Sequence, residues 1–142
     1  MSVSISKILQ VLDNPESLQN WRERVGLEEA ERISKRSAAI GTAMHKFLEH
    51  WIRDNKDCVD QTEEGILGRK MATKIYEHGI KDKLEDCWDM EARLKFGDYY
   101  HGRLDLSGIY YHQPCVIDFK QANKPKRKEW CWKYMCLSLI HI

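Results

Sequence analysis

The hydrophobic period of this sequence changes once, between Asp86 and Met90. Before that point, apolar residues recur at spacings of three and four, as on one face of a helix. After it they alternate with polar residues, as in a strand with one buried face, at Met90, Ala92, Leu94 and Phe96. Helices followed by strands predict an α+β fold, with N-terminal helices packed on an antiparallel or mixed sheet.

The helical region, residues 4–86, is divided by capping and turn residues. A first helix is expected after Ser4 or Ser6, because either serine can cap the apolar pattern that follows. Asn14-Pro15 is an N-cap followed by proline at the first helical position, so a second helix begins there and ends at Gly26. The remaining pattern predicts a helix over residues 27–53, continuous or broken near Ser37, a loop over residues 54–62 and a helix over residues 63–86.

The strand region, residues 88–120, predicts a meander. Its strands are expected at Met90–Phe96, Arg103–Tyr111 and Cys115–Lys120, with turns at Gly97-Asp98 and His112–Pro114. A basic segment follows over residues 121–130. The 142 residues leave room for one domain, which we expect over residues 1–136, with three tryptophans in its core: Trp21, Trp51 and Trp88.

The composition is that of a globular chain, with 42% hydrophobic and 32% charged residues. No apolar stretch is long enough to span a bilayer, and the N-terminus lacks the pattern of a secretory leader. Five cysteines without paired spacing favour reduced thiols. We therefore expect a cytoplasmic protein without membrane association.

Two acidic residues and a lysine lie where neighbouring strands should meet. Because side chains alternate along a strand, Asp118 and Lys120 should project from one face and Phe119 from the other. A tight turn folds the preceding strand back, so Asp105 should lie at the same end as Asp118. Carboxylates this close repel unless a cation lies between them, and Mg²⁺ suits such a pair. The alternative is an ordinary hairpin with a surface ion pair, since Asp-x-Lys is a common sequence.

This arrangement suits hydrolysis of phosphodiester bonds. A divalent ion neutralises charge that develops on the phosphate and lowers the pKa of a bound water. Lys120 can orient or help to deprotonate that water and stabilise the transition state. The carbonyl oxygen of Phe119 is a further candidate metal ligand. Asp118 and Lys120 also end a strongly apolar strand, where charges are costly unless they have a role.

Two segments, Gly102-Arg103-Leu104-Asp105 and Ile117-Asp118-Phe119-Lys120, together resemble the signature of the PD-(D/E)XK nuclease superfamily. The segment from Gly41 to Glu49 resembles the histidine-bearing helix of its RecB-like branch, which includes mitochondrial genome maintenance exonuclease and similar phage exonucleases. The likeness spans Val3 to Trp130. It implies a restriction-endonuclease-like core and a Mg²⁺- or Mn²⁺-dependent deoxyribonuclease, more an exonuclease than an endonuclease. Such an enzyme would act on single-stranded DNA or free ends in DNA processing, repair or phage replication, in a bacterial or phage-infected cytoplasm.

The resemblance also implies roles for single residues. Glu91 matches a further acidic position of the family, although a solvated surface residue fits the sequence equally well. Gly41 would allow its helix to pack closely against the sheet. His45 would be a metal ligand together with Asp105, Asp118 and Phe119, and the catalytic residues would be Asp105, Asp118, Lys120 and the supporting carboxylate Glu49.

The C-terminal end departs from that family pattern. A helix with a Gln-x-x-x-Tyr element usually follows the lysine strand, and the sequence after Lys120 has no such element. Residues 137–142, Leu-Ser-Leu-Ile-His-Ile, correspond to the translation of a widely used sequencing adapter. We expect this tail to be non-native, with a natural apolar C-terminus as the alternative. If the tail is non-native, the nuclease core is truncated, and the resemblance does not imply that this chain itself is active.

Three other interpretations fit parts of the sequence. An iron–sulfur nuclease of the same superfamily needs four clustered cysteines, and without a C-x-x-C we expect no such cluster. A purely structural domain leaves the acidic residues unexplained. A non-catalytic DNA-binding fragment would hold phosphates and stack bases through the basic segment, which otherwise is a solvated tail: Lys124, Lys126, Arg127 and Lys128, with Trp130 and Trp132 nearby.

Overall fold

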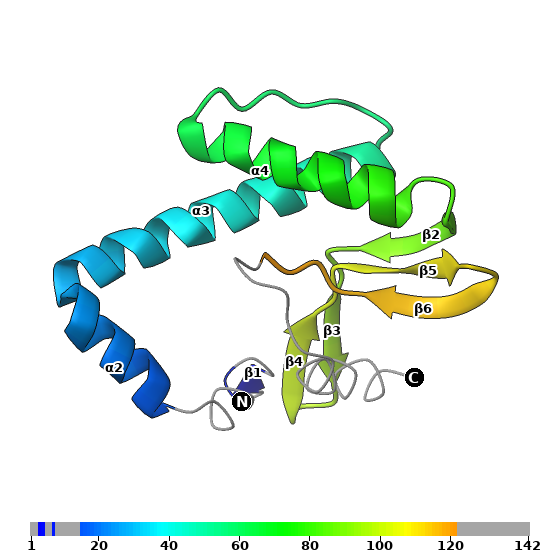
Figure 1. Ribbon diagram of the computed structural model, residues 1–142. Coiled ribbons are helices and arrows are strands. Elements are labelled where there is room, and N and C mark those ends of the chain that lie inside the picture. The colour runs from blue at the N-terminus through cyan, green and yellow to red at the C-terminus, as the bar shows by residue number, and fades with distance from the viewer. Residues whose placement is uncertain (1–2, 5–6, 8–14, 122–142) are drawn as a thin grey trace.

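The computed structural model describes residues 3–4, 7 and 15–121, and its fold is α+β as predicted (Figure 1). The helices are α2 (Pro15–Val25), α3 (Leu27–Ile52) and α4 (Glu63–Ile75), and α4 continues into a π-helical turn, η1 (Tyr76–Ile80). The strands are β1 (Val3–Ser4), β2 (Leu84–Met90), β3 (Arg93–Phe96), β4 (Tyr100–Arg103), β5 (Leu106–Tyr110) and β6 (Gln113–Ile117). The helix expected after Ser4 or Ser6, the basic cluster at residues 124–128 and the tail over 137–142 lie outside the described residues, apart from Lys7.

Local sequence signals correctly predicted both ends of α2 and the start of α4. Helix α2 begins at Pro15 and ends at Val25, because Gly26 has a φ of 92° that a helix does not allow. Helix α3 is continuous through Ser37, which decides between the two alternatives that the sequence left open. Helix α4 follows the predicted loop, and its N-cap Thr62 accepts a hydrogen bond from the Gly65 amide at 3.0 Å.

The prediction of a helix over residues 63–86 is wrong beyond Ile80, because Leu84–Met90 forms strand β2. Two register shifts interrupt the pairing of β2 with β5. As a result the more buried residues of this strand recur every third position, at Leu84, Cys87 and Met90. Bulges thus give the strand a spacing that imitates a helix.

The strands form two three-stranded sheets, ordered β1-β4-β3 and β2-β5-β6. Hydrogen bonds also join the sheets: the Glu91 amide donates to the Asp105 carbonyl at 2.9 Å, and the Leu104 amide donates to the Ala92 carbonyl at 3.0 Å. One long hairpin therefore bends from one sheet into the other at residues 91–92 and 104–105, which we call the corner. The predicted strands Met90–Phe96 and Arg103–Tyr111 are each divided there, and Glu91 bends the backbone with a φ of 53°.

Helices α3 and α4 pack against each other on the side of the second sheet where β2 lies, and α3 passes behind α4 in Figure 1. On the α4 side, a Cβ atom at Gly68 would lie 2.6 Å from the Cβ of Ala43, so the two backbones approach closely because position 68 is glycine. The fully buried Phe47 and Leu48 belong to one core cluster with Ala72 of α4 and Leu106 of β5.

Two aromatic residues that were predicted to be buried are exposed. Trp88 is 55% exposed, whereas Trp51 packs against the core, so the core assignment is wrong for Trp88 and confirmed for Trp51. Phe96, expected on the buried face of its strand, is also 55% exposed.

Within the described residues, no helix is both long and apolar enough to cross a bilayer.

Candidate metal centre

The corner places two carboxylates side by side. Glu91 and Asp105 are opposed across the hairpin, where the amide of Glu91 donates to the carbonyl of Asp105. Each side chain is only 12% exposed. Two acidic side chains removed from water at one point raise each other's electrostatic energy, so the corner favours a positive charge between them.

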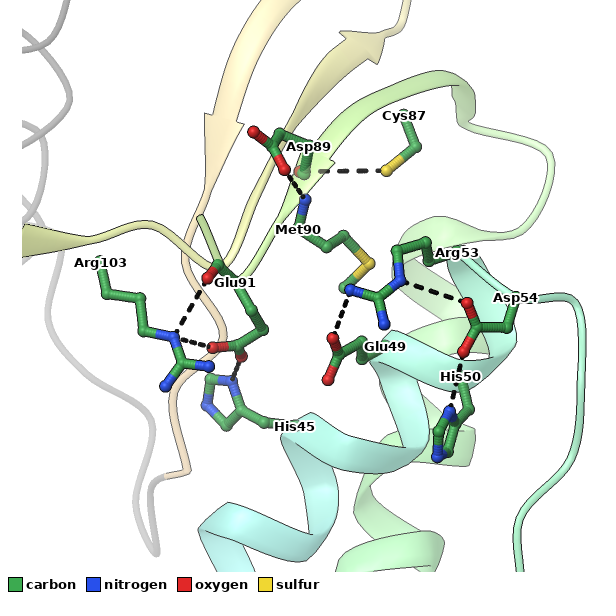
Figure 2. A network of polar contacts seen from close by, with 10 residues as sticks. All are labelled: His45, Glu49, His50, Arg53, Asp54, Cys87, Asp89, Met90, Glu91 and Arg103. Atoms are coloured by element: carbon green, nitrogen blue, oxygen red, sulfur yellow. Dashed lines mark hydrogen bonds and ion pairs between the residues drawn. The ribbon is translucent and has the colours of Figure 1, made fainter. Parts of the chain in front are cut away.

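Helix α3 brings a histidine to these carboxylates. The Nδ1 atom of His45 lies 3.1 Å from Glu91 Oε1 and 3.8 Å from Asp105 Oδ1. Figure 2 shows the imidazole pointing from α3 toward the Glu91 carboxylate. One ligand atom from each of the three residues lies within 4.8 Å of the others. We call these three residues the His–Glu–Asp group.

The orientation of His45 follows from the packing of α3. His45 adjoins the buried Met44 in sequence and lies one turn after Gly41, so it borders the apolar face of the helix. Its ring also meets the buried ring of Phe119 edge to face, with 6.1 Å between the centroids. The hydrophobic contact of α3 with the sheet region therefore also positions the imidazole.

Asp105 is linked to the chain beyond β6. Its Oδ2 atom accepts a hydrogen bond from the Phe119 amide at 2.6 Å. Burial raises the pKa of the Asp105 carboxyl above its ordinary value, and the nearby Asp118 carboxylate raises it as well. The Phe119 hydrogen bond and the charges of His45 and Lys120 act in the opposite direction. Asp105 is thus a mostly buried carboxyl whose second oxygen is held by the segment after β6.

The predicted meeting of Asp105 with the Asp-Phe-Lys segment is confirmed in outline. Phe119 is buried while Asp118 and Lys120 are exposed, so the two charged residues lie on the opposite side from Phe119, as predicted. The Lys120 ammonium lies 2.9 Å from Asp118 Oδ1. Asp118 is not one of the three clustered ligand residues, however, and Glu91 occupies the place expected for it.

The segment also ends its strand earlier than predicted. Strand β6 stops at Ile117, whereas we expected it to continue to Lys120. The partner strand β5 begins only at Leu106, since its chain turns away at the corner, and the Phe119 amide bonds to a side chain instead of a neighbouring backbone. The contribution of the Phe119 carbonyl to a metal site stays a prediction.

Two residues of α3 lie differently from the roles implied for them. Glu49 has its carboxylate 2.6 Å from Arg53 Nη1, and Figure 2 shows it directed to Arg53 instead of His45. A Cβ atom at Gly41 would lie 3.3 Å from the Gln121 side chain, so this glycine borders the residue after Lys120 and not the sheet itself. Neither residue belongs to the His–Glu–Asp group.

Sequence reasoning missed Arg103. Its Nε atom lies 2.6 Å from Glu91 Oε2 and donates to the Glu91 carbonyl at 3.2 Å (Figure 2). The Glu91 carboxylate is therefore held from both sides, by His45 and by Arg103. Alternation would place Arg103 and Asp105 on one face of a straight strand, but the contact of Arg103 with Glu91 depends on the bend at the corner.

The donor set suits a divalent cation. Two carboxylates and one imidazole are ligands that Mn²⁺ and related ions accept, and the carboxylates also suit Mg²⁺. The donor atoms lie close enough together to share one cation. In comparisons with known proteins, no family model matches the chain, and no curated protein matches it significantly.

Proposed function

We propose that this protein is a metal-dependent deoxyribonuclease that uses Mg²⁺ or Mn²⁺ bound by the His–Glu–Asp group. The observation that carries the proposal is the convergence of His45, Glu91 and Asp105 beside the Asp118–Lys120 pair. These residues come from α3, from both sides of the corner and from the segment after β6, so only the folded chain brings them together.

The residues present fit the metal. Glu91 and Asp105 offer oxygen donors, and His45 offers a nitrogen donor, all within 4.8 Å. When bound, such an ion supplies positive charge that stabilises a scissile phosphate and lowers the pKa of a coordinated water. Arg103 holds the second oxygen of Glu91, and the Phe119 amide holds the second oxygen of Asp105, so each carboxylate is oriented by a second partner.

Lys120 supplies the remaining charge of the site. Its side chain is 47% exposed, and its ammonium pairs with Asp118 next to Asp105. At this position an ammonium can bind a phosphate oxygen and orient an attacking water, as the resemblance to the PD-(D/E)XK superfamily implies. Asp118 holds the ammonium near the site in this arrangement.

The same proposal includes the class of reaction. The resemblance favours stepwise removal of nucleotides from DNA ends over internal cleavage, in DNA processing, repair or phage replication. The Cys58, Cys87 and Cys115 thiols in the described part are unpaired, in keeping with a reducing cytoplasm of a bacterium or a phage-infected cell.

The test is cleavage of end-labelled single-stranded and duplex DNA, and of circular DNA, with Mg²⁺ or Mn²⁺. The wild-type chain should shorten linear DNA only when metal is present. Asp105→Asn should abolish cleavage while DNA binding persists, and Asp82→Asn, which removes an exposed carboxylate at the turn before β2, should leave the rate unchanged. Cleavage of the circle would overturn the exonuclease assignment. Absence of metal-dependent cleavage from every substrate would overturn the nuclease proposal.

A further inference from the structure

The β3–β4 hairpin has a row of basic residues on one face. Arg93 is paired with Arg103, and Lys95 with His101, across the two strands. Because side chains alternate along a strand, these residues share one face, while Leu94, Phe96 and Tyr100 lie on the other. Each of the four basic residues is exposed. We call Arg93, Lys95, His101 and Arg103 the basic ladder.

Arg103 pairs with Glu91 across the hairpin, but the stability of the hairpin does not explain the other basic residues of the ladder. Like charges directly opposite each other destabilise a strand pair, and Arg93 faces Arg103. Lys95 pairs with the 93% exposed Asp98, which is a contact of small value. Within residues 15–121, no ion pair is found for Arg93. Arg93 and the exposed Lys95 therefore offer positive charge that an anionic ligand can neutralise.

The basic ladder leads directly to the His–Glu–Asp group. Arg103 contacts Glu91, and Asp105 follows Arg103 at the next position of the same strand parity. Figure 1 shows that β3 and β4 extend from the corner in the direction away from the second sheet. Successive rungs of the ladder are about 6.8 Å apart, as two residues of an antiparallel strand with a rise of about 3.4 Å each. This repeat is comparable to the separation of neighbouring phosphates along a nucleic-acid strand.

We propose that the basic ladder binds the sugar–phosphate backbone of the DNA strand that enters the metal centre. The ligand is the backbone and not the bases, because the stacked rings of Phe96 and Tyr100, 5.1 Å between centroids, lie on the opposite face of the hairpin. The direction toward a cleavage site rests on the proposed nuclease function, whereas the binding of phosphate by the ladder does not.

The test compares charge removal in the ladder with the same charge removal elsewhere. Arg93→Gln combined with Lys95→Gln removes two ladder charges without touching the His–Glu–Asp group. The matched control is Lys70→Gln combined with Lys74→Gln, which removes two exposed charges from α4. Arg93→Lys combined with Lys95→Arg keeps the charge. Binding of a labelled oligonucleotide, single-stranded or duplex, is followed by fluorescence anisotropy in EDTA across a range of salt concentrations.

The ladder variant should lower the slope of log Kd against log salt by about 1.4 for single-stranded DNA and about 1.8 for duplex, as expected for two lost phosphate contacts. At about 0.1 M salt this corresponds to roughly 25-fold weaker binding of the single strand. The charge-preserving variant should keep the wild-type slope. If the ladder variant behaves like the α4 control, or if the wild-type chain binds neither DNA, the proposal is overturned.

These outcomes separate the ladder from the nuclease proposal. If the salt slope depends on the ladder but the chain cleaves no DNA, the proposed binding surface is supported and the nuclease proposal is overturned. If the wild-type chain cleaves DNA with metal but the ladder variant keeps the wild-type slope, the nuclease proposal is supported and the proposed binding surface is overturned. Circular dichroism spectra of all variants establish that each comparison is made between folded proteins.

Discussion

The interface between α3 and α4 and the corner of the long hairpin are stabilised by different forces. At the interface, Ala43 and Gly68 bring two backbones together, and nearby apolar side chains such as Phe47 and Leu48 are fully buried. At the corner, the contacts are ion pairs and hydrogen bonds around Glu91 and Asp105. Helix α3 belongs to both regions, since His45 borders the face that carries Phe47 and Leu48.

This difference separates stability from chemistry. Burial of apolar area is the main favourable term in folding, so the interface should account for most of the stability of the chain. Buried acidic groups contribute little stability and are costly when unpaired. A substitution at the interface should therefore change unfolding first, whereas one at the corner should change metal binding and cleavage first.

Phe47→Ala should have the largest effect on stability. Phe47 is 0% exposed and packs against Trp51 with 5.8 Å between ring centroids. Its truncation should lower the free energy of unfolding by about 3–5 kcal/mol, through lost burial and the cavity that remains. Urea denaturation followed by circular dichroism measures this change.

Ile66→Ala is the matched control, because Ile66 lies on α4 and is 59% exposed. It should change the free energy of unfolding by no more than about 0.5 kcal/mol. Equal losses from Phe47→Ala and Ile66→Ala would show that the interface is not the main source of stability.

Two substitutions at Asp105 should separate the two properties at one position. Asp105→Asn keeps an oxygen that can accept the Phe119 amide, whereas Asp105→Ala leaves this amide of a buried residue without its partner. Only the alanine variant should lose stability, by about 1–3 kcal/mol. Both should lose metal-dependent cleavage, since neither retains the carboxylate.

Calorimetric titration with Mn²⁺ and urea denaturation of both variants would test this expectation. Binding of Mn²⁺ by Asp105→Asn with wild-type affinity would remove Asp105 from the metal centre. An equal loss of stability in both variants would show that the negative charge, and not the Phe119 hydrogen bond, matters for folding.

Two glycines on the same pair of helices should respond in opposite directions. A Cβ at Gly68 would meet Ala43 Cβ at 2.6 Å and the Ile40 carbonyl at 2.9 Å, so Gly68→Ala should cost about 1–3 kcal/mol by overpacking. A Cβ at Gly41 would meet only the flexible end of Gln121, at 3.3 Å. Gly41→Ala should therefore be neutral or stabilising by up to about 1 kcal/mol, since alanine favours the helix.

Thermal or urea denaturation of the two glycine variants measures which substitution lowers the stability more. A larger loss at Gly41 than at Gly68 would restore the close packing that the family resemblance implied for Gly41. It would also move the tightest contact of α3 from α4 to the segment after Lys120.

Features that depend on neighbouring residues in the sequence were predicted correctly, whereas features that depend on contacts between distant segments were not. Asn14-Pro15, Gly26 and Thr62 act on their immediate neighbours, and the ends of α2 and the start of α4 were predicted from such signals. The bulges of β2 depend on pairing with β5, so they could not be read from residues 84–90 alone. Their spacing of three even favoured the wrong element.

The candidate site shows the same limit. Asp105 was placed beside the Asp-Phe-Lys segment because one tight turn determines the register of that hairpin. Glu91 stayed undecided and Arg103 was missed, since their roles depend on the bend between two sheets. Sequence alternation predicts which face a residue takes along a straight strand, but it does not predict where a strand bends.

Glu49→Gln should have the smallest effect, and it tests the resemblance directly. Glu49 lies one helical turn after His45, where the family pattern implies a supporting carboxylate, yet its carboxylate pairs with Arg53. Arg53 is half exposed, so the loss of this pair should cost about 0.3–0.5 kcal/mol of stability. Mn²⁺ affinity and cleavage should stay at wild-type levels, because Glu91 supplies the second carboxylate at the corner. A variant that folds normally but no longer cleaves DNA would show that Glu49 leaves Arg53 during the reaction, and that the metal centre extends along α3 beyond the corner.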